Sequence, residues 1–186
     1  MDAYHASLVG KAEYLWNQYL YTDSGVANEL AWALSTAGSS YGQRGEHDAA
    51  LESCELAVRV LRDRIDQGTG TQQDESDIPL LLSNLAGAHG DAHHPAELLA
   101  AWREAVEQQR RVHAAWSLED DDWVLAYVLH GYADAALDLG FESEARSSLR
   151  EADDLLAEVF ERRPRFAREL MDQVEVTRMR LPAESA

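Results

Sequence analysis

Residues 34–57 read LSTAGSSYGQRGEHDAALESCELA, and this stretch decides the fold because its small residues are spaced for contact between two helices. Gly38 and Ala50 allow two helix backbones to approach closely, and Gly45 supplies the backbone conformation of a tight turn between them. Ala57 follows Ala50 by seven residues and so returns to the same helix face. The stretch therefore predicts an antiparallel pair of helices.

The same spacing recurs twice, first 48 residues later and then after another 47 residues. Its three copies are Leu34, Ala37, Gly38, Tyr41, Gly45, Ala50, Cys54 and Ala57; Leu82, Leu85, Ala86, His89, His93, Leu98, Trp102 and Ala105; and Leu129, Tyr132, Ala133, Ala136, Gly140, Ala145, Leu149 and Ala152. A period of this length is typical of stacked helical hairpins. We therefore expect three helix pairs, at residues 24–66, 78–116 and 120–162.

This pattern resembles the tetratricopeptide repeat over residues 24–162, with the long period of its extended forms. The first and third copies match best, whereas the second has His93 at the turn glycine, Pro95 shortly after it, and Leu98 at the small contact position. These departures put a regular turn in the second copy in question. The resemblance implies a right-handed stack of antiparallel helix pairs, an α-solenoid, whose function is to bind a protein or peptide.

Composition favours an all-α chain of about eight helices in a single domain spanning residues 1–186. The chain has 29 alanines, 4 prolines and 11 glycines, and its apolar residues recur at helical spacing. We expect capping helices at 1–22 and 164–181, because the open ends of a helical stack need cover. Their predicted apolar faces are Tyr4, Leu8, Ala12, Leu15 and Tyr19 in the first, and Phe166, Leu170, Val174 and Leu181 in the second.

Helix ends can also be predicted from the residues that flank them. Either Asp23 or Ser24 is suited to cap the helix that runs to about residue 44. The polar stretch 68–77 reads as a mobile loop, and Asp77 with Pro79 reads as the start of the next helix. The acidic run 119–122 precedes the third pair, where negative charge complements the helix dipole; a calcium loop is the weaker interpretation.

The net charge of −18 disfavours nucleic acid, which requires a basic face. An acidic surface serves solubility or attracts a cationic partner. No apolar run reaches the length of a membrane span, so we expect a cytoplasmic protein without a membrane partner. Of 16 basic residues, 15 are arginine, as in proteins of GC-rich actinobacteria. Six of them lie at 162–180, where they either tie down the last helix or form a separate basic contact site.

The resemblance assigns the partner-binding groove to the first helix of each pair. The positions it implies are Trp32, Ser35, Ser39 and Gln43 in the first copy, Leu80, Ser83, Gly87 and Asp91 in the second, and Tyr127, His130, Asp134 and Asp138 in the third. None of these residues is lysine or arginine, and the set contains aromatic rings and carboxylates. A groove of this composition suits a cationic protein or peptide that also carries an apolar part.

Enzymatic chemistry has weaker support. His89, His93 and His94, with Asp91, could hold a metal, but the segment crosses a predicted turn, so packing or turn roles are favoured. Cys54 falls on a packing position and is interpreted as a core residue rather than a reactive thiol. We expect no cofactor and lean against an enzyme. The alternatives are self-association into a homo-oligomer, and a small-molecule or metal-dependent activity at the groove or at the histidines.

Overall fold

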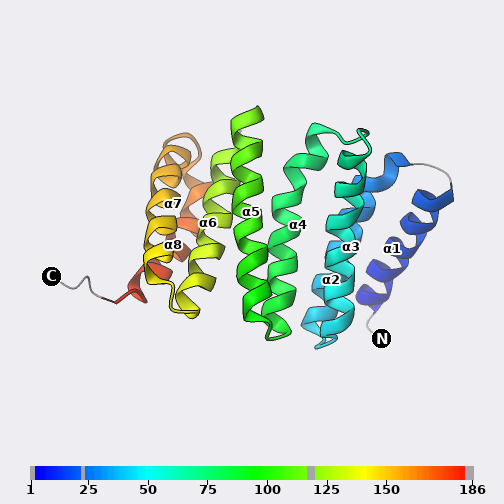
Figure 1. The fold of residues 1–186 in the computed structure, drawn as a ribbon, viewed down its shortest axis with the longest axis horizontal. Helices are drawn as coiled ribbons and strands as arrows, with labels where there is room; N and C mark the ends of the chain where they lie inside the picture. The colour runs from blue at the N-terminus through cyan, green and yellow to red at the C-terminus, as the bar shows by residue number, and fades with distance from the viewer. Residues whose placement is uncertain (1–2, 22–23, 117–119, 183–186) are drawn as a thin grey trace. The chain divides into compact units, whose positions relative to one another are not determined.

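A computed structural model describes residues 3–21, 24–116 and 120–182, and within these ranges the chain is all-α, as predicted. The helices are α1 (Ala3–Tyr21), α2 (Ala27–Gln43), α3 (His47–Asp66), α4 (Gln72–Asp91), α5 (Pro95–Trp116), α6 (Asp121–Asp138), α7 (Glu142–Arg162) and α8 (Pro164–Met179), with a 3₁₀ turn η1 at Ser24–Val26 (Figure 1). None of these helices combines the length and apolarity needed to cross a membrane.

The helices divide into two compact units, Met1–Ala101 and Trp102–Ala186, with the boundary inside α5. In the first unit α2 packs against α1, α3 and α4. In the second unit α6, α7 and α8 each contact the other two. The expectation of a single solenoid domain over 1–186 stays a prediction, and each unit is described by itself below.

The first copy of the repeated motif packs as its small residues predict. Ala50 and Cys54 of α3 lie in the core against α2, with 0% and 1% of their surfaces exposed. A Cβ atom added at Gly38 would lie 2.6 Å from the Cys54 sulfur and 3.1 Å from the Ala50 carbonyl oxygen. Only glycine therefore allows α2 and α3 to approach this closely. Burial raises the pKa of the Cys54 thiol to about 11, which fits the predicted core role.

The third copy builds the core of the second unit in the same way. Ala133 and Ala136 of α6 and Ala145 and Ala152 of α7 are fully buried. Larger side chains, including Leu149 and Leu156 of α7, fill the space around these small contacts. Small residues on facing helices thus set the close spacing in both units, and most of the largest fully buried side chains are leucines.

The turns of all three copies have the same backbone geometry, including the second copy, in which the sequence departs from the pattern. Gly45, His93 and Gly140 adopt positive φ angles of 75°, 58° and 81°. In each copy the next residue's N–H donates to the carbonyl five positions earlier, at 3.0, 2.9 and 2.8 Å respectively. This is the hydrogen bond that closes a helix end of the Schellman type. The turn after α4 is therefore regular, and His93 occupies a left-handed conformation that normally selects glycine.

Two predicted helix starts are wrong. Helix α4 begins at Gln72 rather than near 78, because Thr71 and Asp74 form a reciprocal capping box in which each side chain accepts the other's backbone N–H. The expected loop at 68–77 is consequently short, and Pro79 lies inside α4. Helix α2 follows η1, and its N-cap is Val26 without a side-chain cap. Ser24 is therefore not its cap, and Asp23 lies outside the described residues.

The predicted apolar faces of the terminal helices are correct in part. Ala12 and Leu15 of α1 are buried, but Tyr4 is 67% exposed, and the buried residue beside it is His5. His5 Nδ1 is 2.9 Å from Ser40 Oγ of α2, so this position satisfies a polar contact instead of an apolar one. In α8, Leu170 and Val174 are buried as expected, whereas Phe166 is 43% exposed.

Candidate functional site

Two groove positions of α2, Trp32 and Ser35, form the contact with α4. The Trp32 indole Nε1 donates to Asp77 Oδ2 at 2.9 Å, and Asn84 Nδ2 donates to Ser35 Oγ at 2.8 Å. Ser35 is 1% exposed. Asn28 also donates to Asp77 Oδ2, at 2.7 Å. These polar side chains satisfy one another between two helices, so their hydrogen-bonding groups are already engaged.

The remaining groove positions of α2 and α4 are mostly small or polar residues. Ser39, Gln43 and Asp91 are exposed, and Gly87 is exposed as well. Ser39 Oγ donates to the carbonyl of Ser35 at 3.2 Å. Ser83 is buried, its hydroxyl donating to the Leu80 carbonyl at 2.7 Å, and Leu80 is half-buried. Apart from Trp32, the groove positions of the first unit therefore offer a short, mainly polar strip.

Tyr127 belongs to an aromatic cluster of the second unit. Its ring stacks on Trp123 at 5.5 Å with an interplanar angle of 7°, and Trp102 meets it edge-on at 6.0 Å. Phe166 of α8 lies 4.8 Å from Trp123. Such offset and edge contacts add to the stability of the packed rings. The sequence therefore identified one member of a cluster that joins α5, α6 and α8.

Side chains of α8 and of its C-cap contact the acidic groove positions of α6. Thr177 Oγ1 donates to Asp134 Oδ1 at 3.2 Å and lies 3.0 Å from His130 Nε2. Arg180 pairs with both Asp134 and Asp138, and these carboxylates raise the pKa of its guanidinium. The expectation of a groove without basic residues is therefore wrong at this end.

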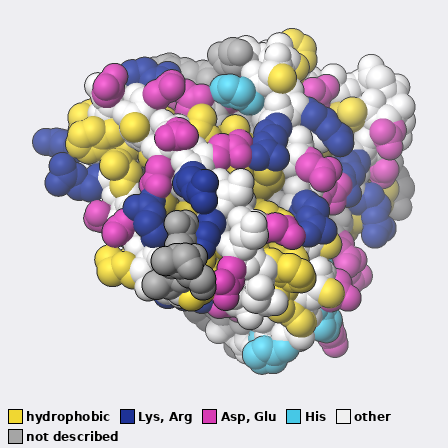
Figure 2. All heavy atoms as spheres, turned by 60° about the vertical axis from the view of Figure 1, so that its left-hand side comes forward, with side chains coloured by type: hydrophobic (Ala, Val, Ile, Leu, Met, Phe, Trp, Pro, Cys, Tyr) yellow, Lys and Arg dark blue, Asp and Glu magenta, His cyan; other side chains and the backbone are white. Residues whose placement is uncertain are grey.

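Three other arginines of the C-terminal cluster are paired in the same manner. Arg162 pairs with Asp122, Arg163 with Asp120, and Arg178 with both Asp153 and Glu175. Figure 2, whose view brings the α7 and α8 side forward, shows arginine and acidic side chains intermingled over that face. These pairs support the interpretation that the arginines tie α8 and the end of α7 to their neighbours.

The acidic run before α6 is engaged as well, as far as it is described. Besides the arginine pairs of Asp120 and Asp122, the buried Asp121 accepts a hydrogen bond from Gln109 Nε2 of α5 at 3.3 Å. Asp120 is the N-cap of α6 but makes no side-chain cap bond. Glu119 lies outside the described residues. The carboxylates thus point to different partners on α5, at the end of α7 and just after it.

Within the described residues, the three histidines near the second turn are not arranged as a metal site. His89 and His94 have ring centroids 5.9 Å apart, and burial lowers the pKa of His89. Among residues 3–21, 24–116 and 120–182, no group of three histidine, cysteine or acidic side chains is placed to hold a metal ion. His93 instead serves the turn through its positive φ angle.

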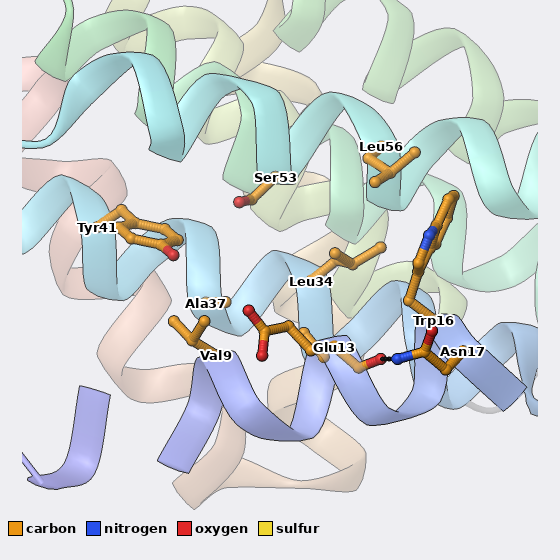
Figure 3. Close-up of a pocket in the computed structure, with 10 residues that line it drawn as sticks. Val9, Glu13, Trp16, Asn17, Leu34, Ala37, Tyr41, Ser53 and Leu56 are labelled. Carbon is orange, nitrogen blue, oxygen red and sulfur yellow. Dashed lines mark hydrogen bonds between the residues drawn. The ribbon is translucent and has the colours of Figure 1, made fainter. Parts of the chain in front are cut away.

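A hollow of about 370 Å³ lies between α1, α2 and α3, at a place that the sequence did not indicate. Val9, Ala12, Glu13, Trp16 and Asn17 line it from α1; Leu34, Ala37 and Tyr41 from α2; and Ser53 and Leu56 from α3 (Figure 3). The α1 residues that line the hollow recur at helical spacing, and this spacing is the signal for them that the sequence contained. Except for Ala12 they lie beside the predicted stripe, and only the packing of three helices shows that they face a hollow.

The hollow combines aromatic and apolar walls with a few polar groups. Trp16 extends toward Leu56 on one side, and Tyr41 lies at the other (Figure 3). The Tyr41 ring is held by an edge contact with His5 at 4.7 Å. Asn17 Nδ2 donates to the Glu13 carbonyl at 2.9 Å, so this side-chain amide is hydrogen-bonded within α1. Mostly apolar walls with a few oriented polar groups are typical of ligand-binding pockets.

Comparison with known proteins supports the fold alone. No family model matches the chain, and no curated protein matches it significantly. A similar solved structure is the crystal structure of BtubC (BKLC) from P. vanneervenii, with a TM-score of 0.57 and 18% sequence identity. The match covers 94% of this chain and 75% of that one. At this identity the likeness establishes an all-α arrangement and carries no statement about activity.

Proposed function

We propose that this chain is a non-enzymatic binding module, built from tetratricopeptide-like helix pairs, that takes up a segment of another protein. The observation that carries the proposal is the hollow between α1, α2 and α3, which is open, largely apolar and flanked by Trp16 and Tyr41. Aromatic side chains in a partly desolvated hollow are the usual anchors of protein recognition. A short extended segment could insert one side chain there and lie across the neighbouring helices.

The groove predicted from the sequence is a weaker binding surface than this hollow. Trp32 and Ser35 are engaged with α4, and Asp134 and Asp138 are paired with Arg180. A partner that used these groups would have to break existing hydrogen bonds or ion pairs, and the cost of separating them would reduce its affinity. The hollow requires no such exchange at its half-buried apolar residues, which include Trp16, Tyr41 and Leu56.

The state of the chain's single cysteine supports a binding role over nucleophilic chemistry. Cys54 is 1% exposed, and burial together with Glu55 raises the pKa of its thiol to about 11. A cysteine nucleophile requires the opposite, an accessible thiol with a lowered pKa. Cys54 therefore contributes packing against Gly38.

A matched pair of substitutions tests the proposed surface. Peptides selected from a displayed random library against the full chain would be measured against Ser53→Leu, which fills the hollow, and Ser39→Leu, which crowds the predicted groove. Both positions are serines of the first unit, and neither is fully buried. Loss of binding in Ser53→Leu alone is expected. Loss in Ser39→Leu alone would assign the site to the groove, and failure to select any specific peptide would count against the binding role.

Self-association is a second candidate, favoured by exposed apolar side chains on the terminal helices. Tyr14 of α1 is 61% exposed, and Val176 and Met179 of α8 are 60% and 72% exposed. Analytical ultracentrifugation over a hundredfold range of concentration would test it. A mass that rises with concentration, and returns to the monomer value in Val176→Asp, would support assembly, whereas a constant monomer mass would exclude it over that range.

A further inference from the structure

Glu13 is the charged side chain that lines the hollow. Figure 3 shows it leaving α1 and extending toward α2, between Val9 and Ala37. Within the described part of the chain, its carboxylate makes no ion pair or side-chain hydrogen bond. Lys11, the nearby cation of α1, pairs instead with Glu29 of α2 at 3.0 Å. The hollow therefore presents an uncompensated negative charge.

The surroundings of this carboxylate favour a cation attached to an apolar stem. Trp16 and Tyr41 offer aromatic rings, which attract cations through the negative charge density of their faces. Leu34, Ala37 and Leu56 provide apolar contact for aliphatic carbons. No lysine or arginine lines the hollow, so an anionic occupant would meet only repulsion from Glu13. A purely apolar occupant would remove water from the carboxylate without replacing its hydrogen bonds.

Arginine fits these requirements better than lysine. Its planar guanidinium can stack on an aromatic ring while it donates two parallel hydrogen bonds to a carboxylate, whereas the ammonium of lysine is a compact and strongly hydrated charge. The net charge of −18 adds long-range attraction for a basic chain. The aromatic rings, the carboxylate and the net negative charge therefore all favour an arginine side chain of a basic segment.

We infer that the hollow between α1, α2 and α3 is an arginine-binding pocket for a basic segment of a partner protein, with Glu13 pairing with the guanidinium. The inference rests on the proposed binding function and specifies which side chain of the partner the hollow recognises. Trp16 and Tyr41 bracket the inserted side chain, and the apolar walls take its methylene groups. The net negative charge of the chain attracts the rest of the basic segment.

The test uses two peptides that differ only in charge, acetyl-Gly-Leu-Arg-Leu-Gly-amide and its counterpart with citrulline in place of arginine. Citrulline keeps the shape of arginine but is neutral. Titration of the ¹⁵N-labelled full chain, followed by NMR, reports on the Trp16 indole N–H and the Ser53 amide. The arginine peptide is expected to shift both signals and to bind about fivefold more tightly than the citrulline peptide.

Two variants locate the effect. Glu13→Gln keeps the size of the side chain and should reduce the affinity for the arginine peptide to that for the citrulline peptide. Glu52→Gln removes the same charge from an exposed position of α3 that does not line the hollow, and should leave the affinity difference intact.

The possible outcomes distinguish a failure of arginine recognition from a failure of the proposed binding function. Equal affinities of the two peptides, or an unchanged affinity difference in Glu13→Gln, would overturn arginine recognition while leaving the hollow as a binding site. A loss of the difference in Glu52→Gln as well would show a general charge effect and also overturn it. If neither peptide shifts the signals of the hollow, the arginine pocket is refuted. The proposed binding function is then tested separately, by measuring the library-selected peptides against the Ser53→Leu variant.

Discussion

The indole N–H of Trp32 donates to the carboxylate of Asp77 at 2.9 Å and thereby joins α2 to α4 across 45 positions of sequence. Asp77 is 7% exposed and also accepts from Asn28 and Gln73, at 2.7 and 2.8 Å. A residue read from the sequence as a helix start is thus the centre of a buried polar network. It fixes the orientation of two helices through their side chains.

Removing this carboxylate should destabilise the first unit strongly. Asp77→Ala leaves three donors without their acceptor, and we expect a loss of about 2 to 4 kcal/mol in the free energy of unfolding. Chemical denaturation followed by circular dichroism measures it. Asp66→Ala, at the exposed end of α3, is the control and should change stability by less than about 0.5 kcal/mol. Equal effects of the two substitutions would contradict the network.

The close approach of α2 and α3 can be tested at Gly38. Gly38→Ala places a methyl group against the Cys54 sulfur and should cost about 1 to 3 kcal/mol, because the core has no room for it. Combining it with Cys54→Ala removes the sulfur and should recover part of that loss. Recovery is incomplete because the Ala50 carbonyl, 3.1 Å from the added atom, is backbone. Additive effects in a double-mutant cycle would show that the two residues are not in conflict.

The turn after α4 should be improved by glycine. His93 holds a φ angle of 58°, which is unfavourable for a residue with a Cβ atom, so His93→Gly should raise the midpoint of thermal unfolding, with a gain of about 0.5 to 1 kcal/mol. His94→Gly, one position later and without a positive φ angle, should instead lower it. If both substitutions lower the midpoint, the left-handed strain at His93 is not significant.

Stability should fall as the pH is lowered through the range in which histidine titrates. Burial lowers the pKa of His130 from its ordinary value of 6.5, although Asp134 opposes the shift. The unfolded chain therefore takes up a proton before the folded chain does, so this contribution to stability is complete above about 6.5 and is lost as the pH falls below it. Denaturation midpoints measured from pH 7.5 to 5.5 should fall, and His130→Gln should reduce that slope.

The slope will not vanish in that variant, because burial also lowers the pKa of His89. The double variant with His89→Gln should flatten the profile further. An identical pH dependence in the original chain and in His130→Gln would show that His130 titrates equally in the folded and unfolded states.

The helices and their turns were largely readable from the sequence because their signals are local. The positions of Gly45 and Gly140 correctly predicted two helix ends, whereas the turn at His93, which the departures in the second copy had put in question, is regular in the structure. The start of α4 was missed because Thr71 and Asp74 form a capping box inside a stretch whose composition resembles a loop. Polar residues that favour turns are the same ones that cap helices, so composition alone did not separate the two.

The sequence by itself determined an all-α chain of paired helices, because the spacing of small and apolar residues specifies which faces must meet. It also predicted the contact of Gly38 with Ala50. Only the tertiary structure decided that Arg180 pairs with both Asp134 and Asp138, and that three helices leave a hollow beside Glu13. The physical reason is distance along the chain. Helix formation depends on neighbours within a few residues, whereas the partners of a charge and the walls of a pocket are brought together by packing.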